Sequence, residues 1–346
     1  MSCARHILLA RLSSVGDIVL ATPVAARLRA ENPEAHMSWL VDSGYRDLVE
    51  HNPHIDQVLE YDYIGRHNGT SGVRRLAREI GPVDLMIDLQ HKVRTLMLAA
   101  VLRPAERRVL VKRRGFGVFR ALIGHDAILR SPHQVARYLA VLESGESESQ
   151  QAPRPVPQLR AAARDLEWAR DLLGGSDGPG PIVGLIPGAR HETKRWPAIN
   201  LARLADRCIA KGFRVALLGG ESDGPVSRAV SDSMSGRPIL VRAGGSLGQL
   251  AGLLGLCAAV VSPDSGPAHM AAALGIPVVA LFGPTSPERW APVGSRVKVV
   301  GMDLPCMPCS NHGSATCPEG THECLAALEP ERVWQALVEI MEPVNG

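Results

Sequence analysis

Aromatic side chains and long apolar runs are scarce in this sequence. Only four Phe, four Tyr and five Trp occur among its 346 residues, which excludes extended stacking surfaces for bases or long glycans. The apolar runs at residues 7–10 and 278–282 are too short for the core of a signal peptide or for the roughly 20 residues of a membrane span. We therefore expect a cytoplasmic protein whose contact with a membrane, if any, is peripheral.

Lysine and two signature motifs are also lacking. The chain has 5 Lys against 33 Arg, and its formal net charge is only +3, which argues against nucleic acid as a partner. Neither a GxxxxGK[ST] loop nor a GxGxxG fingerprint occurs. Their absence argues against a P-loop nucleotidase and a dinucleotide-dependent dehydrogenase.

Apolar strand-like segments alternate with helical segments along the chain. Residues 6–12, 37–41 and 83–89 have the apolar composition of buried strands, whereas residues 17–31 and 95–102 have helical periodicity. This alternation predicts an α/β protein with a doubly wound parallel sheet.

A polar, proline-rich stretch at residues 145–157 has the composition of an interdomain linker. We therefore predict two Rossmann-like domains, residues 1–157 and 158–346, facing each other across a cleft. The last helix, residues 330–341, has no strand partner in the alternation, and its docking on the N-terminal domain is left open. Strands of the second domain are expected at residues 182–186, 213–218, 258–262 and 278–282.

Polar residues follow a strand of the second domain at Asp264, Ser265, Gly266 and His269. Asp264 or Ser265 is suited to cap the next helix, which places the amides of Ser265 and Gly266 at its positive end. Such a position favours a phosphate or diphosphate, with His269 within reach of an oxygen. The alternative is a well-capped helix with a solvated histidine.

Two other strand ends of this domain carry candidate ligand-binding residues. Gly188 permits close approach of the backbone, and Lys194 and Arg195 offer cationic donors beside it. Glu221 follows a third strand, where a carboxylate suits a ribose hydroxyl. The alternative for the first of these segments is a surface turn anchored by Trp196.

The N-terminal domain has a matching turn between a strand and a helix, with Ser14 as the expected N-cap and Asp17 three residues later. A carboxylate at this point suits a general base toward a sugar hydroxyl. A helix N-terminus favours the ionised form, so Asp17 is a weak base unless desolvation raises its pKa. The alternative is an aspartate that serves the helix end.

A basic segment spans residues 92–120, with nine cationic residues against Glu106 alone. It suits an anionic acceptor such as a charged glycolipid, and Lys92, Arg94, Arg113 and Arg114 are candidate contacts. Nucleic acid and a merely solvated surface are the competing interpretations.

Four of the seven cysteines cluster near the C-terminus: Cys306, Cys309, Cys317 and Cys324. Four thiolates that include one CxxC pair suit a structural zinc or iron, with no open position for catalysis. Reduced thiols and disulfides formed on isolation are the alternatives.

Taken together, the motifs resemble glycosyltransferase family 9, the lipopolysaccharide heptosyltransferases, and the heptosyltransferase II type in particular. The resemblance runs nearly end to end, and its motifs are the stretches at residues 12–17, 88–90, 187–189, 194–197, 264–269 and 283–287. It implies a GT-B fold and metal-independent, inverting transfer from ADP-L-glycero-β-D-manno-heptose to the inner core of lipopolysaccharide.

The resemblance also implies roles for individual residues. Asp17 matches the base and Lys194 the residue that neutralises the leaving diphosphate, while Ser14 and Gln90 join the acceptor side. The C-terminal domain would bind the donor and the N-terminal domain the acceptor; some relatives hold iron in the cysteine-rich segment. The chain departs from the family at Ala189, Arg190 and Ser222.

Two other functions are weighed against this one. The first is a GT-B transferase or epimerase that uses another nucleotide sugar. The second is a non-enzymatic binding protein stapled by a metal at the four cysteines.

Overall fold

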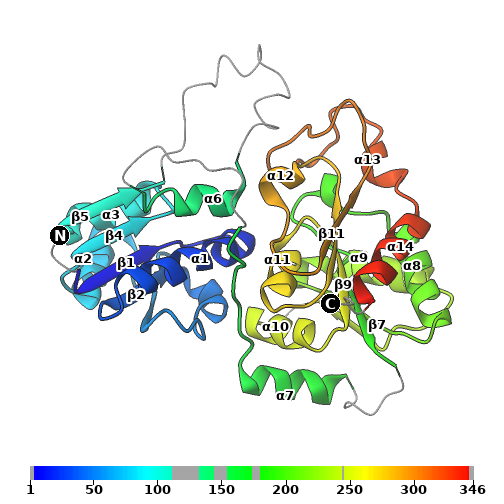
Figure 1. Ribbon diagram of the computed structural model, residues 1–346, viewed down its shortest axis with the longest axis horizontal. Helices are drawn as coiled ribbons and strands as arrows, with labels where there is room; N and C mark the ends of the chain where they lie inside the picture. The colour runs from blue at the N-terminus through cyan, green and yellow to red at the C-terminus, as the bar shows by residue number, and fades with distance from the viewer. Residues whose placement is uncertain (1–3, 111–131, 144–153, 174–179, 244, 343–346) are drawn as a thin grey trace. The chain divides into compact units, whose positions relative to one another are not determined.

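A computed structural model describes residues 4–110, 132–143, 154–173, 180–243 and 245–342 (Figure 1). The chain divides into two compact units, and the boundary after the proline-rich stretch falls between Arg160 and Ala161. Each unit is built around its own parallel sheet with helices along it.

The N-terminal unit contains a five-stranded sheet in the order β3-β2-β1-β4-β5, and every pair of neighbouring strands is parallel. Its central strand β1 is apolar and buried from its second residue onward, as expected for a strand covered on both faces. Four α-helices and one 3₁₀ helix accompany the strands in the described part of this unit. The elements are β1 (His6–Ala10), α1 (Val15–Glu31), β2 (His36–Val41), η1 (Ser43–Leu48), β3 (Gln57–Glu60), α2 (Gly69–Ile80), β4 (Leu85–Asp88), α3 (Val93–Leu102), β5 (Glu106–Val109) and α6 (Gln134–Leu139).

The C-terminal unit contains a six-stranded sheet in the order β11-β10-β9-β6-β7-β8, again entirely parallel. Together the two sheets confirm the predicted α/β class and its two doubly wound parallel sheets. The strands are β6 (Ile182–Leu185), β7 (Arg214–Gly219), β8 (Leu240–Ala243), β9 (Ala259–Pro263), β10 (Val278–Phe282) and β11 (Val297–Gly301). The helices are α7 (Ala163–Leu172), η2 (Glu192–Lys194), α8 (Ala198–Ala210), η3 (Glu221–Asp223), α9 (Gly224–Ser233), α10 (Leu247–Gly255), α11 (Gly266–Ala273), α12 (Pro287–Trp290), α13 (Glu323–Ala326) and α14 (Pro330–Met341).

The last helix, α14, finds its partners within the C-terminal unit. It packs on β9, β10, β11 and α8, and its apolar stripe of Val333, Leu337 and Ile340 is buried in that unit's core. Positions four and three residues apart lie on one face of a helix, so this stripe needs a single apolar surface to cover it. The sheet of the C-terminal unit supplies that surface.

The strand order fixes where each unit can bind a ligand. In the N-terminal sheet the order reverses between β1 and β4, and in the C-terminal sheet between β6 and β9. Open parallel sheets bind ligands beyond the carboxyl ends of the strands at such a switch point. The turns after β1 and β4, and those after β6 and β9, are therefore the places to examine.

Candidate active site

Asp17 lies in the first turn of α1, directly after β1. Its Oδ2 is 2.7 Å from the Arg11 guanidinium and accepts a hydrogen bond of 3.0 Å from the Ser14 hydroxyl. Its Oδ1 accepts a hydrogen bond of 2.6 Å from the hydroxyl of Tyr138 on α6. The Asp17 side chain remains 21% exposed, which leaves its carboxylate accessible to a further hydroxyl group.

These neighbours decide the charge of Asp17. Desolvation by burial favours the neutral acid, but the Arg11 charge and the hydroxyls of Tyr138 and Ser14 outweigh it and hold the pKa of Asp17 below its ordinary value. Desolvation and the Asp17 charge in turn raise the pKa of Tyr138, so its hydroxyl stays protonated as a donor. Asp17 is thus a carboxylate at neutral pH, as expected from its place at a helix N-terminus.

Arg11 and Tyr138 are site residues that the sequence analysis did not identify. The buried Arg11 also donates to the Leu89 carbonyl oxygen, at 2.7 Å, and so joins the ends of β1 and β4. The one available signal for Arg11 was a cation that ends an apolar strand. Tyr138 gave no signal, because it lies 121 residues from Asp17 in the sequence.

Gln90 follows β4 at the same switch point and is buried. Its side-chain Oε1 accepts a hydrogen bond of 3.3 Å from the Leu12 backbone amide. The backbone amide of Gln90 donates to the Asp88 carboxylate at 3.1 Å. Gln90 therefore ties the turn after β4 to the turn that carries Ser14 and Asp17.

In the described part of the basic segment, residues 92–110, the cations have different partners. Arg107 on β5 pairs with the buried Asp88 at 2.6 Å, and Arg108 pairs with Glu106 at 2.6 Å, so these two cations are used within the unit. Lys92 and Arg94 at the start of α3 are exposed, and the Arg94 guanidinium lies 3.3 Å from the centre of the Tyr63 ring. Arg113 and Arg114 lie outside the described residues.

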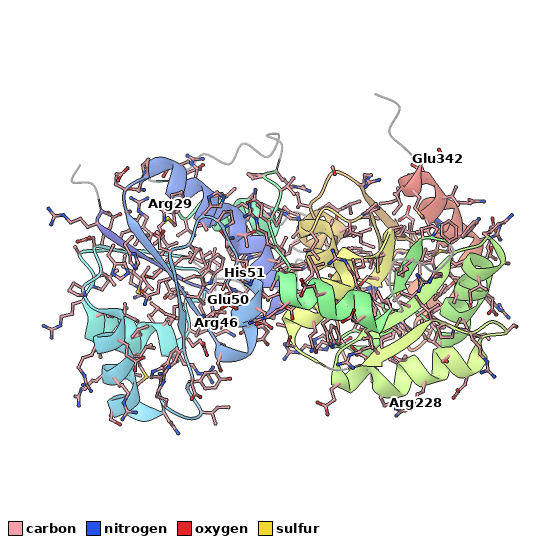
Figure 2. All side chains as sticks on the ribbon, turned by 90° about the horizontal axis from the view of Figure 1, so that it is seen from below. Arg29, Arg46, Glu50, His51, Arg228 and Glu342 are labelled. Carbon is pink, nitrogen blue, oxygen red and sulfur yellow. The ribbon has the colours of Figure 1, made fainter. Side chains whose placement is uncertain are left out.

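Other cations of the N-terminal unit, away from its switch point, also form ion pairs with nearby carboxylates. Figure 2 shows Arg46 and Glu50 side by side on the N-terminal unit, and Arg46 lies 3.0 Å from Glu50 and 2.7 Å from Glu60. Such partly exposed pairs contribute little to stability. They do show that a positive charge in this sequence is a weak guide to the acceptor side.

The C-terminal switch point brings together two residues predicted from separate motifs. Lys194, at the end of the loop after β6, lies 2.7 Å from Asp264 at the end of β9. The same Asp264 oxygen accepts a hydrogen bond of 2.6 Å from Thr285, which follows β10. Both side chains of the ion pair are largely buried, so the Lys194 charge has a defined position.

The N-terminus of α11 lies next to this pair in the chain. Ser265 is its N-cap and Gly266 its first residue, with Pro267 in the first turn. The first N–H groups of a helix have no acceptor within the helix and favour an anion. His269 lies one turn further on and is buried rather than solvated.

The other predicted donor contacts have different surroundings. Gly188 leaves room for the carboxylate of Asp223, with which a Cβ at this position would collide. Arg195 donates to the Ala189 carbonyl oxygen at 3.0 Å and braces its own loop. Glu221 is exposed at the end of β7.

The predicted metal site is not supported. Among the described residues, no group of three or more His, Cys, Asp or Glu side chains is placed to hold a metal, and the four clustered cysteines are free thiols. Cys324 lies on α13, where its sulfur packs against Gly283, while the other three lie in the preceding loop. Burial, more than the neighbouring thiols, raises the pKa of Cys309 and, to about 11, that of Cys324.

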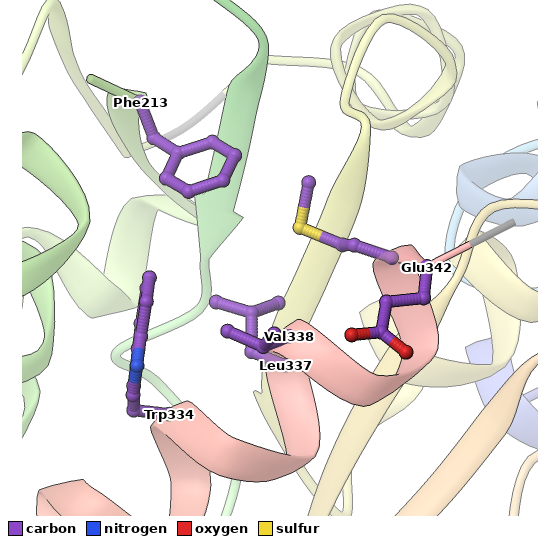
Figure 3. A pocket seen from close by; sticks show the side chains of 6 residues that line it. Phe213, Trp334, Leu337, Val338 and Glu342 are labelled. Carbon is purple, nitrogen blue, oxygen red and sulfur yellow. The ribbon is translucent and has the colours of Figure 1, made fainter. Parts of the chain in front are cut away.

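An apolar pocket of about 320 Å³ lies at the other end of the C-terminal sheet (Figure 3). Phe213, which precedes β7, and Trp334 on α14 form two of its walls, with ring centres 6.2 Å apart. The pocket lies by the amino end of β7, whereas the switch-point residues follow carboxyl ends, so it is separate from the candidate site. Its lining residues are Phe213, Trp334, Leu337, Val338, Met341 and Glu342.

Two doubly wound parallel sheets with polar groups at their switch points have the architecture of the two-domain GT-B fold. The chain belongs to glycosyltransferase family 9 (heptosyltransferase), whose family model matches residues 73–318. It is therefore a glycosyltransferase, and at the level of the family a heptosyltransferase of lipopolysaccharide core biosynthesis. This excludes the interpretation as a non-enzymatic, metal-stapled binding protein.

Individual relatives agree with this assignment. The chain is 26% identical over 356 residues to the lipooligosaccharide heptosyltransferase 2 of Haemophilus influenzae, covering 97% of this chain and 99% of the relative. It is similar to the family 9 glycosyl transferase structure from Veillonella parvula, with a TM-score of 0.81, 26% identity and 97% of both chains covered. The Escherichia coli ADP-heptose LPS heptosyltransferase II matches with a TM-score of 0.76 and 24% identity, covering 97% of this chain and 98% of that one. The predicted resemblance to the heptosyltransferase II type is confirmed.

Proposed function

We propose that this protein is an inverting, metal-independent heptosyltransferase that moves heptose from ADP-L-glycero-β-D-manno-heptose to the inner core of lipopolysaccharide. The observation that carries the proposal is the Lys194–Asp264 ion pair beside the N-terminus of α11, at the C-terminal switch point. A fixed cation and free amide donors at this place suit a nucleoside diphosphate.

Asp17 performs the acceptor step. Its carboxylate accepts the proton of the acceptor hydroxyl while the oxygen of that hydroxyl forms a bond to the anomeric carbon of the heptose. A single displacement at this carbon inverts its configuration. Arg11 and Tyr138 keep the carboxylate ionised and oriented, so the base is ready at neutral pH although its driving force for proton transfer is modest.

Lys194 and the start of α11 perform the donor step. The bond between the anomeric carbon and the diphosphate oxygen breaks, and ADP leaves with the electron pair and a growing negative charge. The Lys194 ammonium and the amides near Ser265 and Gly266 stabilise that charge where it develops. These groups supply positive charge from the chain itself, which supports metal-independent transfer.

Nucleotide binding tests this function directly. We expect ADP to bind with a clear heat in calorimetry and UDP to bind at least tenfold more weakly, because the donor is an ADP sugar. ADP-heptose and a heptose-deficient lipopolysaccharide should then give an α-linked product, identified by the one-bond coupling between C1 and H1 of the heptose in NMR. Tight binding of UDP with no binding of ADP would indicate a transferase or epimerase for another nucleotide sugar.

We also propose that α3 faces the cytoplasmic side of the inner membrane, which carries the anionic glycolipid acceptor. Val93, Met97 and Val101 are exposed at positions four residues apart, so they form one apolar stripe on this helix. Lys92 and Arg94 are exposed at its N-terminal end and suit anionic lipid headgroups. No helix in the described parts of the chain is both long and apolar enough to cross a bilayer.

The α3 proposal predicts binding to anionic vesicles. The protein is expected to co-sediment with phosphatidylglycerol–phosphatidylethanolamine vesicles, and the double change Val93→Glu, Met97→Glu should weaken this roughly tenfold by adding charge to the apolar stripe. Ile199→Glu is the matched control, since Ile199 is equally apolar and 48% exposed but lies on α8 of the other unit. Equal binding by the double variant and the control would contradict a role for α3.

A further inference from the structure

The segment that carries the clustered cysteines, residues 306–324, packs on the loop that carries Lys194. Thr193 is buried, and its hydroxyl donates to the Ser314 carbonyl oxygen at 2.8 Å and accepts from the Ser314 amide at 2.9 Å. The His322 imidazole donates to the Thr193 carbonyl oxygen at 2.7 Å. The residue directly before Lys194 is thus held on both its side chain and its backbone by this segment.

Gly313 brings the same segment against Lys194 itself. Its φ is +90°, and a Cβ added there would lie 2.7 Å from Cδ and 2.9 Å from Cγ of Lys194, and 2.9 Å from Cβ of His191. These distances are shorter than real Cβ contacts, so a side chain at residue 313 would displace the lysine stem or its loop. Only glycine combines this positive φ with so close an approach.

Lys194 is therefore confined from two directions. Asp264 holds the ammonium at 2.7 Å, and the backbone at Gly313 abuts the middle of its aliphatic stem. A lysine stem has four rotatable bonds, and a free one would spread its charge over many positions. Stabilisation of a leaving group requires that charge at one place before the reaction occurs.

We propose that the cysteine-bearing segment is a positioning element for Lys194, with Gly313 as the residue in contact and Thr193 as the anchor. The inference rests on the proposed function, because it takes Lys194 as the cation for the ADP diphosphate. It gives the segment a role in donor binding that requires no bound metal. Gly313 and Thr193 are positioning residues, acting on the diphosphate only through Lys194.

Gly313→Ala tests the proposal, and Gly320→Ala is its matched control. Gly320 lies in the same segment and also has a positive φ, +72°, but a Cβ there meets nothing within 4 Å. Both changes strain the backbone, and only the first reaches Lys194. We expect Gly313→Ala to weaken ADP binding about tenfold and raise KM for the donor, with adenosine binding unchanged; Gly320→Ala should bind ADP as the unaltered protein does.

A double variant shows whether the effect passes through Lys194. Gly313→Ala in a Lys194→Ala background should bind ADP no more weakly than Lys194→Ala alone, because the displaced charge is already gone. If the protein binds no ADP at all, the proposed function fails. If ADP binds and Gly313→Ala matches Gly320→Ala, or if its loss adds fully to that of Lys194→Ala, the positioning role fails instead.

Thr193 provides a second route should Gly313→Ala not fold. Thr193→Ser keeps the hydroxyl that joins Ser314 in both directions, whereas Thr193→Val removes it at similar volume. Thr193→Val is expected to lower ADP affinity about tenfold while adenosine affinity is unchanged. Thr193→Ser is expected to keep most of the ADP affinity of the unaltered protein. Equal ADP affinity in the two variants would overturn the anchoring role.

Discussion

Asp17→Asn is expected to lower kcat for heptosyl transfer by roughly 10²- to 10⁴-fold, the range lost when a general base is removed. The amide has nearly the shape of the carboxylate and can still accept the Tyr138 hydrogen bond, but it cannot take the proton of the acceptor hydroxyl. The measurement is single-turnover transfer from ADP-heptose. ADP binding, which depends on groups of the C-terminal unit, should persist within about twofold.

Loss of folding must be separated from loss of chemistry in this experiment. Asp17→Asn leaves the buried Arg11 charge without its partner, which lowers the free energy of unfolding, so the variant must be assayed below its own melting temperature. Near-normal turnover by a folded Asp17→Asn protein would show that another group is the base.

Tyr138→Phe is the companion variant and acts on the pKa of Asp17 rather than on its presence. Because that pKa is depressed, Asp17 stays ionised at any pH at which an ordinary aspartate is ionised, and it gives kcat/KM no acid limb in that range. The stability from its ionised form is likewise present above the unfolded-state pKa and is lost as pH falls through the folded-state value. Removing the Tyr138 hydroxyl raises the pKa of Asp17, so the acid limb should move to higher pH while kcat at neutral pH changes little.

Lys194→Met is expected to lower kcat by roughly 10²- to 10³-fold, because it removes a charge that acts on the leaving diphosphate in the transition state. Methionine keeps the apolar stem that abuts Gly313 and leaves Asp264 without its cation. ADP affinity should fall as well, while adenosine affinity should not. Lys194→Arg should restore only part of the rate, since a guanidinium directs its donors differently from an ammonium.

Lys298→Met is the matched control for Lys194. Lys298 is also a lysine in an ion pair, 2.7 Å from Glu339, but it lies on β11 and is more exposed. Its replacement should leave kcat and KM within about twofold. A loss as large as that of Lys194→Met would mean that general charge, rather than the position at the switch point, determines the rate.

The central strands could be predicted from the sequence and the edge strands could not. The segments at β1, β6, β9 and β10 are continuous apolar runs, because a central parallel strand is buried on both faces. The edge strand β5 begins with Glu106, Arg107 and Arg108, and β8 and β11 carry Arg242 and Lys298. An edge strand is only partly covered, so it lacks the apolar run by which a strand is recognised.

Some residues of the candidate site could likewise be predicted from the sequence, and others could not. The turns that carry Asp17, Lys194 and Asp264 each follow an apolar strand, so their place at the sheet edge was predictable. Arg107 is one of the nine cations counted in the basic segment, but the structure pairs it with Asp88. Residues as distant as Tyr138 are invisible to a local pattern, because the contact depends on how α6 packs on α1.

The sequence by itself determined the two-sheet α/β architecture and the turns that carry the candidate catalytic groups, since alternation and strand-end motifs are local properties of the chain. The tertiary structure decided whether burial would neutralise Asp17, through Arg11 and Tyr138, and where the Lys194 charge lies, through Asp264 and Gly313. It also decided that α14 covers its own sheet. Lys194 is one of only five lysines, but its proposed function depends on partners from two other segments of the chain, which only the fold brings within a few ångströms.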